Sequence, residues 1–303
     1  MDSNTFYTLT AGNKIPLMGL GTSEMGNVEE VVYHSIKDGA RLIDTAAMYG
    51  NEDLIGKGIH KAISEGIIKR EDLFVITKLN TCDRGDPENA IKESLKKLQL
   101  SYVDLYLDHW PFAFKYDGEN KVNKQPMHVV WPKIEKLQEK GYAKAIGVSN
   151  YNVQSLCNLL SFCTIKPSAL EVEFHPYFYQ KHLLDFFNKE KIRVIAFNPL
   201  VRGSYVKSLH ATANLNLLDE AIVKEIGKKY SKTSGQVALN WLISLGIVPI
   251  PRTSSLTRMK ENLGAMSFRL SKEDHDKISE LNKNYRFCST TTWKDIDCID
   301  LFA

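Results

Sequence analysis

Several features typical of other protein classes are missing from these 303 residues. No run of 18 consecutive apolar residues occurs, so the sequence predicts no membrane-spanning helix. Charge of one sign is not in excess either, because 39 lysine and arginine residues face 36 acidic ones and leave a net charge of +3. Such a balance favours neither nucleic acid nor a membrane surface as a partner.

Cysteine and histidine patterns exclude further classes. The five cysteines are odd in number and form no Cys-x-x-Cys pair, and no signal sequence precedes them, so we expect reduced thiols in the cytoplasm. The eight histidines include no His-x-His pair and no His-Glu-x-x-His, so a zinc hydrolase is unsupported and no metal site is expected. A P-loop between Gly50 and Lys57 also fails, because Gly58 replaces the Ser or Thr needed for Mg²⁺.

What the sequence does contain is a repeated unit, in which a short apolar run is followed by a helical pattern. The eight apolar runs lie at 17–21, 41–46, 74–79, 103–109, 144–150, 169–175, 193–200 and 247–251. The helical patterns lie at 28–40, 51–66, 86–100, 127–141, 152–162, 218–231, 233–246 and 271–282. Strands that alternate with helices are parallel and joined by crossovers. Eight of them predict an α/β protein with a closed (β/α)8 or TIM barrel.

An open, doubly wound sheet is the alternative architecture. Such a sheet normally carries a glycine-rich phosphate loop after its first strand, but only Gly19 and Gly21 stand there, with no third glycine. Ahead of the barrel, the turn signal Ala11-Gly12-Asn13 between two short apolar runs predicts an N-terminal β-hairpin. No linker or low-complexity tract interrupts the chain, so we expect residues 1–303 to form one domain.

Polar side chains interrupt three apolar runs near the ends of the predicted strands, at Asp44, Lys78 and His109, and Tyr49 follows in the first of these loops. Singly, such residues are more often helix caps, surface lysines and structural histidines. In a barrel, however, the C-terminal strand ends meet at one rim, where the active site lies. A tyrosine needs a pKa below about 10 to act as an acid at neutral pH. Lys78, kept charged by Asp44, is a cation that would lower it, and His109 could hold a substrate oxygen.

These residues and their surroundings resemble the aldo-keto reductases, and the branch of the aldose reductases in particular. The matching segments, in the family's order, are IPLMGLGT (15–22), DTAAMYGNE (44–52), DLYLDHWP (104–111), GVSNY (147–151), VEFHP (172–176), AFNPL (196–200) and PRTSSLTRMKEN (251–262). The resemblance implies a barrel that binds a nicotinamide dinucleotide without a Rossmann domain and transfers hydride to a carbonyl carbon. Tyr49 would be the general acid, Asp44 and Lys78 would tune it, and His109 would orient the carbonyl.

The resemblance also implies a cofactor site on the same rim. Ser149 and Asn150 would hydrogen-bond the nicotinamide carboxamide, and Phe197 would stack on its ring. The segment 251–262 would hold the adenosine 2′-phosphate, where Arg252 replaces a common lysine. Its guanidinium suits NADPH, and its different reach could also admit NADH. The implied cofactor-binding set is Gly21, Thr22, Asp44, Ser149, Asn150, Glu171, Phe197, Asn198, Leu200, Arg252, Thr253, Ser254, Ser255, Arg258, Glu261 and Asn262.

Two acidic residues depart from the family's pattern. Glu171 stands where a glutamine usually meets the carboxamide. An ionised glutamate only accepts hydrogen bonds, and its charge would favour the oxidised, cationic ring, so Glu171→Gln is predicted to change the affinities for the two redox forms unequally. Asp108 replaces an apolar residue beside His109, and strand alternation points it away from His109, toward the helices. The sequence offers no physical account of Asp108.

The expected substrate pocket is more polar than is usual in this branch. Ser23 and Asn80 stand where aldose reductases have tryptophan, whereas Trp110 is kept and Met48 precedes Tyr49. This favours hydroxylated substrates such as sugar aldehydes. The tail 285–303 is expected to fold over the mouth of the barrel, as tails in the family do. Its candidate substrate contacts are Trp293, Cys298 and Leu301.

The sequence thus predicts NADPH-dependent reduction of aldoses or other small carbonyl compounds, with NADH as a further candidate cofactor. The protein would be a cytoplasmic monomer without nucleic-acid or membrane partners. The alternative is a regulatory subunit of the same fold that binds the cofactor with little turnover, against which the intact set of four residues argues. Aldose, aliphatic aldehyde and ketone substrates all stay open at this point.

Overall fold

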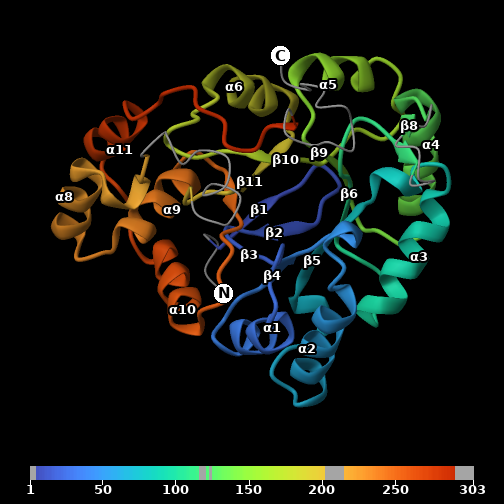
Figure 1. Ribbon diagram of the computed structural model, residues 1–303, viewed down its shortest axis with the longest axis horizontal. Coiled ribbons are helices and arrows are strands. Elements are labelled where there is room, and N and C mark those ends of the chain that lie inside the picture. The colour runs from blue at the N-terminus through green and yellow to red at the C-terminus, as the bar shows by residue number, and fades with distance from the viewer. Residues whose placement is uncertain (1–4, 116–120, 123–124, 202–214, 291–303) are drawn as a thin grey trace.

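The eight apolar runs form the eight parallel strands of a barrel, and the helices surround these strands (Figure 1). The computed structural model describes residues 5–115, 121–122, 125–201 and 215–290. Its parallel strands are β3 (Leu20–Gly21), β4 (Leu42–Asp44), β5 (Phe74–Leu79), β6 (Leu105–Asp108), β9 (Ile146–Ser149), β10 (Ala169–Glu173), β11 (Arg193–Phe197) and β12 (Val248–Pro249). They lie side by side in the order of the chain. The predicted barrel is confirmed.

The barrel closes where β3 meets the end of β12. The amide of Gly19 donates to the carbonyl of Pro249 at 3.0 Å, and the amide of Gly21 donates to that of Pro251 at 3.2 Å. The backbones come so close that a Cβ atom on Gly21 would lie 2.8 Å from the carbonyl oxygen of Ile250. Closure therefore depends on a residue without a side chain at position 21.

Alternation along the strands separates two apolar cores. The apolar side chains that fill the barrel interior are Leu42, Phe74, Ile76, Leu105, Leu107, Ala145, Ala169, Ile195, Val248 and Ile250. Their neighbours along the strands, such as Ile43, Val75 and Tyr106, point outward and pack in the larger core with the helices. The same alternation carries every second residue at the C-terminal strand ends toward the mouth of the barrel.

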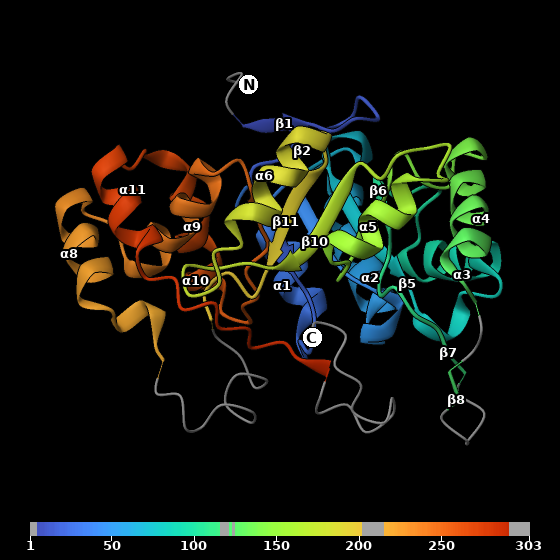
Figure 2. The ribbon, with the colours of Figure 1, turned by 90° about the horizontal axis from the view of Figure 1, so that it is seen from above.

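The predicted hairpin covers the opposite end of the barrel (Figure 2). Its strands β1 (Phe6–Thr8) and β2 (Lys14–Pro16) are antiparallel, and Gly12 takes the left-handed conformation of the turn with φ of 91°. Leu9 and Ile15 pack into the barrel interior at the end that the hairpin covers. Polar groups therefore reach the interior from the other end, the mouth.

The surrounding helices largely follow the predicted patterns. They are α1 (Val28–Lys37), α2 (Glu52–Ser64), α3 (Pro87–Leu98), α4 (Met127–Glu139), α5 (Val153–Leu160), α6 (Lys181–Glu190), α8 (Ala221–Tyr230), α9 (Ser234–Ser244), α10 (Leu256–Leu263) and α11 (Lys272–Ser279). The carboxylate of Asp86 caps α3 by accepting from the amide of Asn89. Nowhere in the described ranges is a helix both long and apolar enough to cross a membrane.

Four elements were not predicted, two helices and two short strands. Helix α6 begins after Gln180 without a side-chain cap, so its sequence lacks a start signal. Helix α10 lies in the polar segment 251–262, which was expected to be a loop, and Ser255 caps it. Strands β7 (Phe114–Lys115) and β8 (Lys121–Val122) form a two-stranded antiparallel pair of only two residues each. Elements this short carry little periodicity for a sequence pattern to show.

The first residues of the C-terminal tail cross the end of β10. The amides of Phe287 and Cys288 donate to the carboxylate of Glu173 at 3.2 and 2.8 Å. This brings the tail to the mouth of the barrel at residues 287–288. The rest of the predicted cover, with Trp293, Cys298 and Leu301, lies outside the described residues.

Candidate active site

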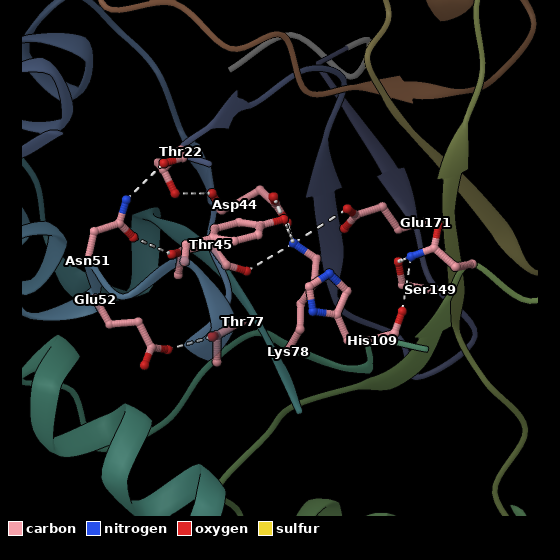
Figure 3. Close-up of polar contacts among 12 residues, drawn as sticks. Thr22, Asp44, Thr45, Asn51, Glu52, Thr77, Lys78, His109, Ser149 and Glu171 are labelled. Atoms are coloured by element: carbon pink, nitrogen blue, oxygen red, sulfur yellow. Dashed lines mark hydrogen bonds and ion pairs between the residues drawn. The ribbon is translucent and has the colours of Figure 1, made fainter. Parts of the chain in front are cut away.

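A buried lysine lies at the centre of the mouth of the barrel (Figure 3). The amine of Lys78, on β5, donates to both carboxylate oxygens of Asp44, at 2.9 and 2.8 Å. It also contacts the carbonyl of Thr45 at 2.9 Å and the phenolic oxygen of Tyr49 at 3.3 Å. The imidazole of His109 packs edge-on against the Tyr49 ring, with ring centres 5.9 Å apart. The predicted four residues thus lie together.

Strand alternation explains this convergence. Asp44 follows the interior residue Leu42 by two positions, and Lys78 follows Ile76 in the same way. His109 comes two residues after Leu107 and so faces the same way. Because β4, β5 and β6 are neighbours in the sheet, their inward side chains meet at one rim.

Tyr49 reaches the site from a loop. The 3₁₀ turn Ala47–Tyr49 follows β4 and ends at Gly50, which has φ of 66° in the left-handed region. This turn brings the phenol back over Lys78, and the ring lies across the lysine amine at 5.0 Å. The glycine at position 50 lets the chain leave the turn and enter α2 two residues later.

The ionisation states follow from burial and from two carboxylates. Burial alone would lower the pKa of Lys78, but the charge and hydrogen bonds of Asp44 outweigh burial and raise that pKa, so the amine stays charged. Burial also raises the pKa of Tyr49, while the charge of Lys78 opposes this rise. Lys78 thus lowers the pKa of Tyr49 as predicted, but burial is the larger effect and keeps that pKa above its ordinary value. The phenol keeps its proton at neutral pH.

His109 is neutral in this setting. Burial and the nearby charge of Lys78 both lower the pKa of His109 well below its usual value. Its Nδ1 atom is buried and has no hydrogen-bond partner in the part of the chain that the structure describes. A neutral imidazole still donates from one ring nitrogen, so His109 can hold an oxygen atom as predicted.

Glu171 adds a second carboxyl group to this cluster. Its Oε1 atom lies 3.4 Å from the amine of Lys78, and its side chain is 3% exposed. Burial and the neighbouring Asp44 raise the pKa of Glu171 well above its usual value. Burial raises the pKa of Asp44 as well, and one lysine balances only one of two buried carboxylates, which favours a proton on Glu171, the carboxyl group farther from the amine. This direction argues against the ionised glutamate expected from the sequence, because a protonated carboxyl group can donate as well as accept, as glutamine does.

The predicted nicotinamide-binding residues lie beside the same cluster. Asn150, in the left-handed region with φ of 61°, donates from its amide side chain to the carbonyl of His109 at 3.0 Å and to Ser149 Oγ at 3.1 Å. On the other side, the hydroxyl of Thr22 donates to the backbone carbonyl of Asp44 at 2.8 Å. Asn150 is thus bonded to the backbone of His109, and Thr22 is bonded to the backbone of Asp44.

The predicted residues after β11 are arranged differently from one another. Phe197 ends β11, is partly exposed and packs at the edge of the barrel interior. The side-chain amide of Asn198 donates to Glu173 at 3.0 Å, so this residue supports the carboxylate that holds the tail. Leu200 packs against the apolar cores. Of these three, Phe197 presents the most suitable surface for a flat ring.

The predicted phosphate segment joins β12 to α10. Arg252 pairs with Gly21 through a parallel bridge, which brings the segment to the rim beside β3. Thr253 Oγ1 accepts from the amide of Ser255 at 3.1 Å, and Ser255 caps α10. The helix N-terminus, with Arg252 and Arg258 beside it, favours an anion. Farther along, Glu261 accepts from Thr233 at 2.7 Å, Asn262 is buried, and the carbonyl of Ser254 accepts from Asn27 at 3.4 Å.

The described part of the substrate pocket has mixed polarity. Ser23 and Asn80 are partly exposed polar residues, and Met48 is an exposed apolar one. Trp110 is buried and tilts between His109 and Phe112, with ring centres at 6.2 and 5.7 Å. Four of the seven predicted pocket residues can thus be placed, and two of them, Met48 and Trp110, are the sequence neighbours of Tyr49 and His109.

Sequence reasoning missed a buried network behind the site. The carboxyl group of Glu52, on α2, accepts from Thr77 at 2.6 Å and from Ser94 at 3.1 Å. The side-chain amide of Asn51 donates to the carbonyl of Thr22 at 2.9 Å. The run Gly50-Asn51-Glu52, polar where a helix begins, is the signal that could have revealed it. Among the described residues no cluster of His, Cys, Asp and Glu is suited to a metal ion.

The comparisons with known proteins agree with this geometry. The sequence model of the Aldo/keto reductase family matches residues 17–283. The chain belongs to the aldo/keto reductase family. The predicted family and reductase class are confirmed.

Individual relatives cover nearly the whole chain. Aldose reductase B of Dictyostelium discoideum is 38% identical over 98% of both chains. Aldo-keto reductase family 1 member A1 of Gallus gallus is 40% identical over 93% of this chain and 90% of its own. The crystal structure of a Bombyx mori aldo-keto reductase in complex with NADP superposes with a TM-score of 0.89 at 34% identity, over 97% of this chain and 98% of the other.

Proposed function

We propose that this aldo-keto reductase uses NADPH to reduce aldoses and other small aldehydes to alcohols, with Tyr49 as the general acid. The observation that carries the proposal is the amine of Lys78, which lies 3.3 Å from the phenolic oxygen of Tyr49 while Asp44 holds it from the other side. A protonated tyrosine beside a fixed cation can lose its proton to an oxygen that gains charge.

The mouth of the barrel carries polar groups that suit a nicotinamide ring. Glu171 Oε2 is buried without a partner in the described ranges, and Ser149 lies beside it across the β9–β10 pair. These groups can hydrogen-bond an amide, and Phe197 offers a ring face. NADPH, when bound, supplies the hydride to the carbonyl carbon. Arg252, Arg258 and the Ser255 cap would hold its 2′-phosphate.

The residues of the chain then handle the proton. The carbonyl oxygen accepts a hydrogen bond from the neutral His109 and a proton from Tyr49. The phenolate that remains is stabilised by Lys78, whose ammonium stays charged because Asp44 is 2.8 Å away. The products are an alcohol and a deprotonated Tyr49, which regains its proton before the next turnover.

The nature of the substrate rests on the pocket and on the relatives. Ser23 and Asn80 offer hydrogen bonds to hydroxyl groups where a wholly aromatic pocket would not. Relatives include aldose reductases and an NAD(P)H-dependent D-xylose reductase of Candida tropicalis, 35% identical over 95% of each chain. Another, from Candida parapsilosis and 37% identical, is named an NADH-dependent D-xylose reductase. Sugar aldehydes are the preferred class, and NADH is the second cofactor to test.

The proposal is tested by following cofactor oxidation with NADPH and with NADH against a panel of aldoses and simple aldehydes. We expect Tyr49→Phe to lower kcat by about 100-fold or more, because the proton donor is removed. Cofactor affinity, measured by quenching of protein fluorescence, should be retained. Binding of NADPH with no turnover of any substrate would instead favour the regulatory subunit of the same fold.

A further inference from the structure

Behind the active site, a buried triad joins three loops at the mouth of the barrel. Arg84 Nη1 donates to Asp108 Oδ1 at 2.9 Å and also to the carbonyl oxygen of Trp110. The hydroxyl of Tyr151 donates to Asp108 Oδ2 at 2.7 Å. All three side chains are almost completely buried. Asp108 does point outward as alternation predicts, but its partners were not foreseen.

The triad brackets His109 along the chain. Arg84 contacts the side chain of Asp108, the residue before His109, and the backbone carbonyl of Trp110, the residue after it. Tyr151 directly follows Asn150, whose amide side chain donates to the carbonyl of His109. Arg84 itself comes from the loop that follows β5, the strand that carries Lys78. The triad therefore ties the exits of β5, β6 and β9, which are neighbours in the sheet.

His109 needs such support, because its ring has little of its own. Catalytic histidines are usually oriented by a hydrogen bond to the second ring nitrogen, yet Nδ1 of His109 has no partner in the described ranges. The ring is held by packing against Tyr49 and Trp110 and by the position of its backbone. That backbone position is what Arg84, Asp108 and Tyr151 determine.

We propose that Arg84, Asp108 and Tyr151 are positioning residues. They hold His109 within hydrogen-bond distance of the substrate carbonyl oxygen by fixing the backbone on both sides of His109. The inference rests on the proposed reductase function. A buried ion pair is weak support for stability by itself, since apolar residues of similar size can replace it without loss. Such a replacement therefore separates a positioning role from a merely structural one.

The test uses the whole protein with Arg84→Met, Asp108→Val and Tyr151→Phe combined. This variant keeps an apolar, filled site and leaves no member of the triad unpaired. We expect it to unfold cooperatively and to bind NADPH within about threefold of the wild type. We expect kcat to fall by about 10- to 100-fold, because small displacements of catalytic groups cost rate steeply. The isotope effect on kcat with NADPH deuterated at the transferred hydrogen should rise, as the chemical step becomes limiting.

A matched control lies at the other end of the same strand. Arg70 Nη2 pairs with Asp104 Oδ2 at 2.7 Å, just before β6 begins. Arg70→Met with Asp104→Val removes an ion pair of the same type far from the mouth, and kcat and the isotope effect should stay at wild-type values. A folded triad variant that keeps the wild-type kcat and isotope effect would overturn the proposal.

Two further measurements keep the test decisive. If the triad variant does not fold, Tyr151→Phe alone removes a single hydroxyl and should lower kcat by about threefold, whereas an unchanged kcat rejects the role. If the wild type turns over no carbonyl compound, the proposed function fails, and the ring signals of His109 in NMR spectra, assigned with His109→Asn, decide the inference. They should shift in the triad variant and stay in place in the Arg70–Asp104 control.

Discussion

At the scale of single residues, one lysine holds the charge of the site while two carboxyl groups compete for it. Asp44 lies 2.8 Å from Lys78, and Glu171 lies 3.4 Å away. Burial raises the pKa of both carboxyl groups, and because the lysine amine offsets this rise more strongly for the closer Asp44, we expect the proton on Glu171. This division changes what Glu171 can do, because a neutral carboxyl resembles the amide of glutamine in its hydrogen bonding.

The charge state of Glu171 predicts its effect on the two redox forms of the cofactor. We expect Glu171→Gln to change the affinities for NADPH and NADP⁺ by similar factors at neutral pH. At high pH, where Glu171 of the wild type ionises, the same comparison should show tighter binding of NADP⁺ by the wild type. Isothermal titration with NADPH and NADP⁺ at two pH values measures these affinities. If the substitution changes the two affinities by very different factors at neutral pH, Glu171 is ionised there.

Stability should respond to the same group with a definite sign. The pKa of Glu171 is higher in the folded chain than the ordinary value of 4.5. The folded state then binds more protons than the unfolded one above pH 4.5, so this group makes the free energy of unfolding fall as pH rises. Urea unfolding should show Glu171→Gln gaining stability relative to the wild type from pH 5 toward pH 8. A constant difference between the two proteins would contradict the raised pKa.

At the scale of elements, Glu173 joins β10 to the start of the C-terminal tail. Its carboxylate accepts from Asn198 at 3.0 Å and Cys288 at 2.8 Å, and it pairs with His175 at 3.1 Å. Burial would raise the pKa of Glu173, but these hydrogen bonds outweigh it and lower that pKa. The tail therefore depends on a carboxylate that stays ionised.

We expect Glu173→Gln to destabilise the protein by about 1–3 kcal/mol, because an amide cannot accept all these bonds. Since the folded pKa is lowered, the difference should be full above pH 4.5, the ordinary value for glutamate, and should shrink below it. Hydrogen exchange should also be faster at the amides of Phe287 and Cys288. Glu190→Gln, which changes a partly buried acid paired with Lys166 away from the tail, is the matched control and should leave that exchange unchanged.

Helices show where element patterns in the sequence suffice and where they fail. The Asp86-Pro87 start of α3 could be predicted directly, because a cap and a proline are local signals. Helix α6 was missed since nothing local starts it, and α10 was hidden in a polar segment that was interpreted as a binding loop. Helix α6 packs against β11, and α10 packs against α1 and α9, so both depend on tertiary contacts.

At the scale of the whole molecule, closure of the barrel brings its two ends together. The strands β3 and β12 lie more than 200 residues apart in the chain, and the amides of Gly19 and Gly21 donate across the seam between them. The phosphate segment after β12 thereby comes to lie beside Gly21. Closure thus assembles the proposed cofactor site as well as the fold.

Gly21→Ala tests this closure. A Cβ atom there would meet the Ile250 carbonyl at 2.8 Å, so the strands must shift apart, at a cost of about 1–3 kcal/mol. We also expect weaker NADPH binding, since Arg252 pairs with this glycine. Gly26→Ala is the matched control, because a Cβ atom on Gly26 would meet nothing within 4 Å beyond its chain neighbours. Equal thermal stability of the two variants would show that closure tolerates a side chain.

The sequence by itself determined the order of strands and helices, the family and the four chemical groups at the mouth, because apolar runs and motif spacing are local features of the chain. Only the tertiary structure decided the direction in which the pKa values of Tyr49 and Glu171 shift and the partners of Asp108. Both depend on burial and on distances between residues such as 84, 108 and 151, which lie far apart in the chain. The spacing of a motif names the groups that meet, but the depth at which they are buried decides their charge.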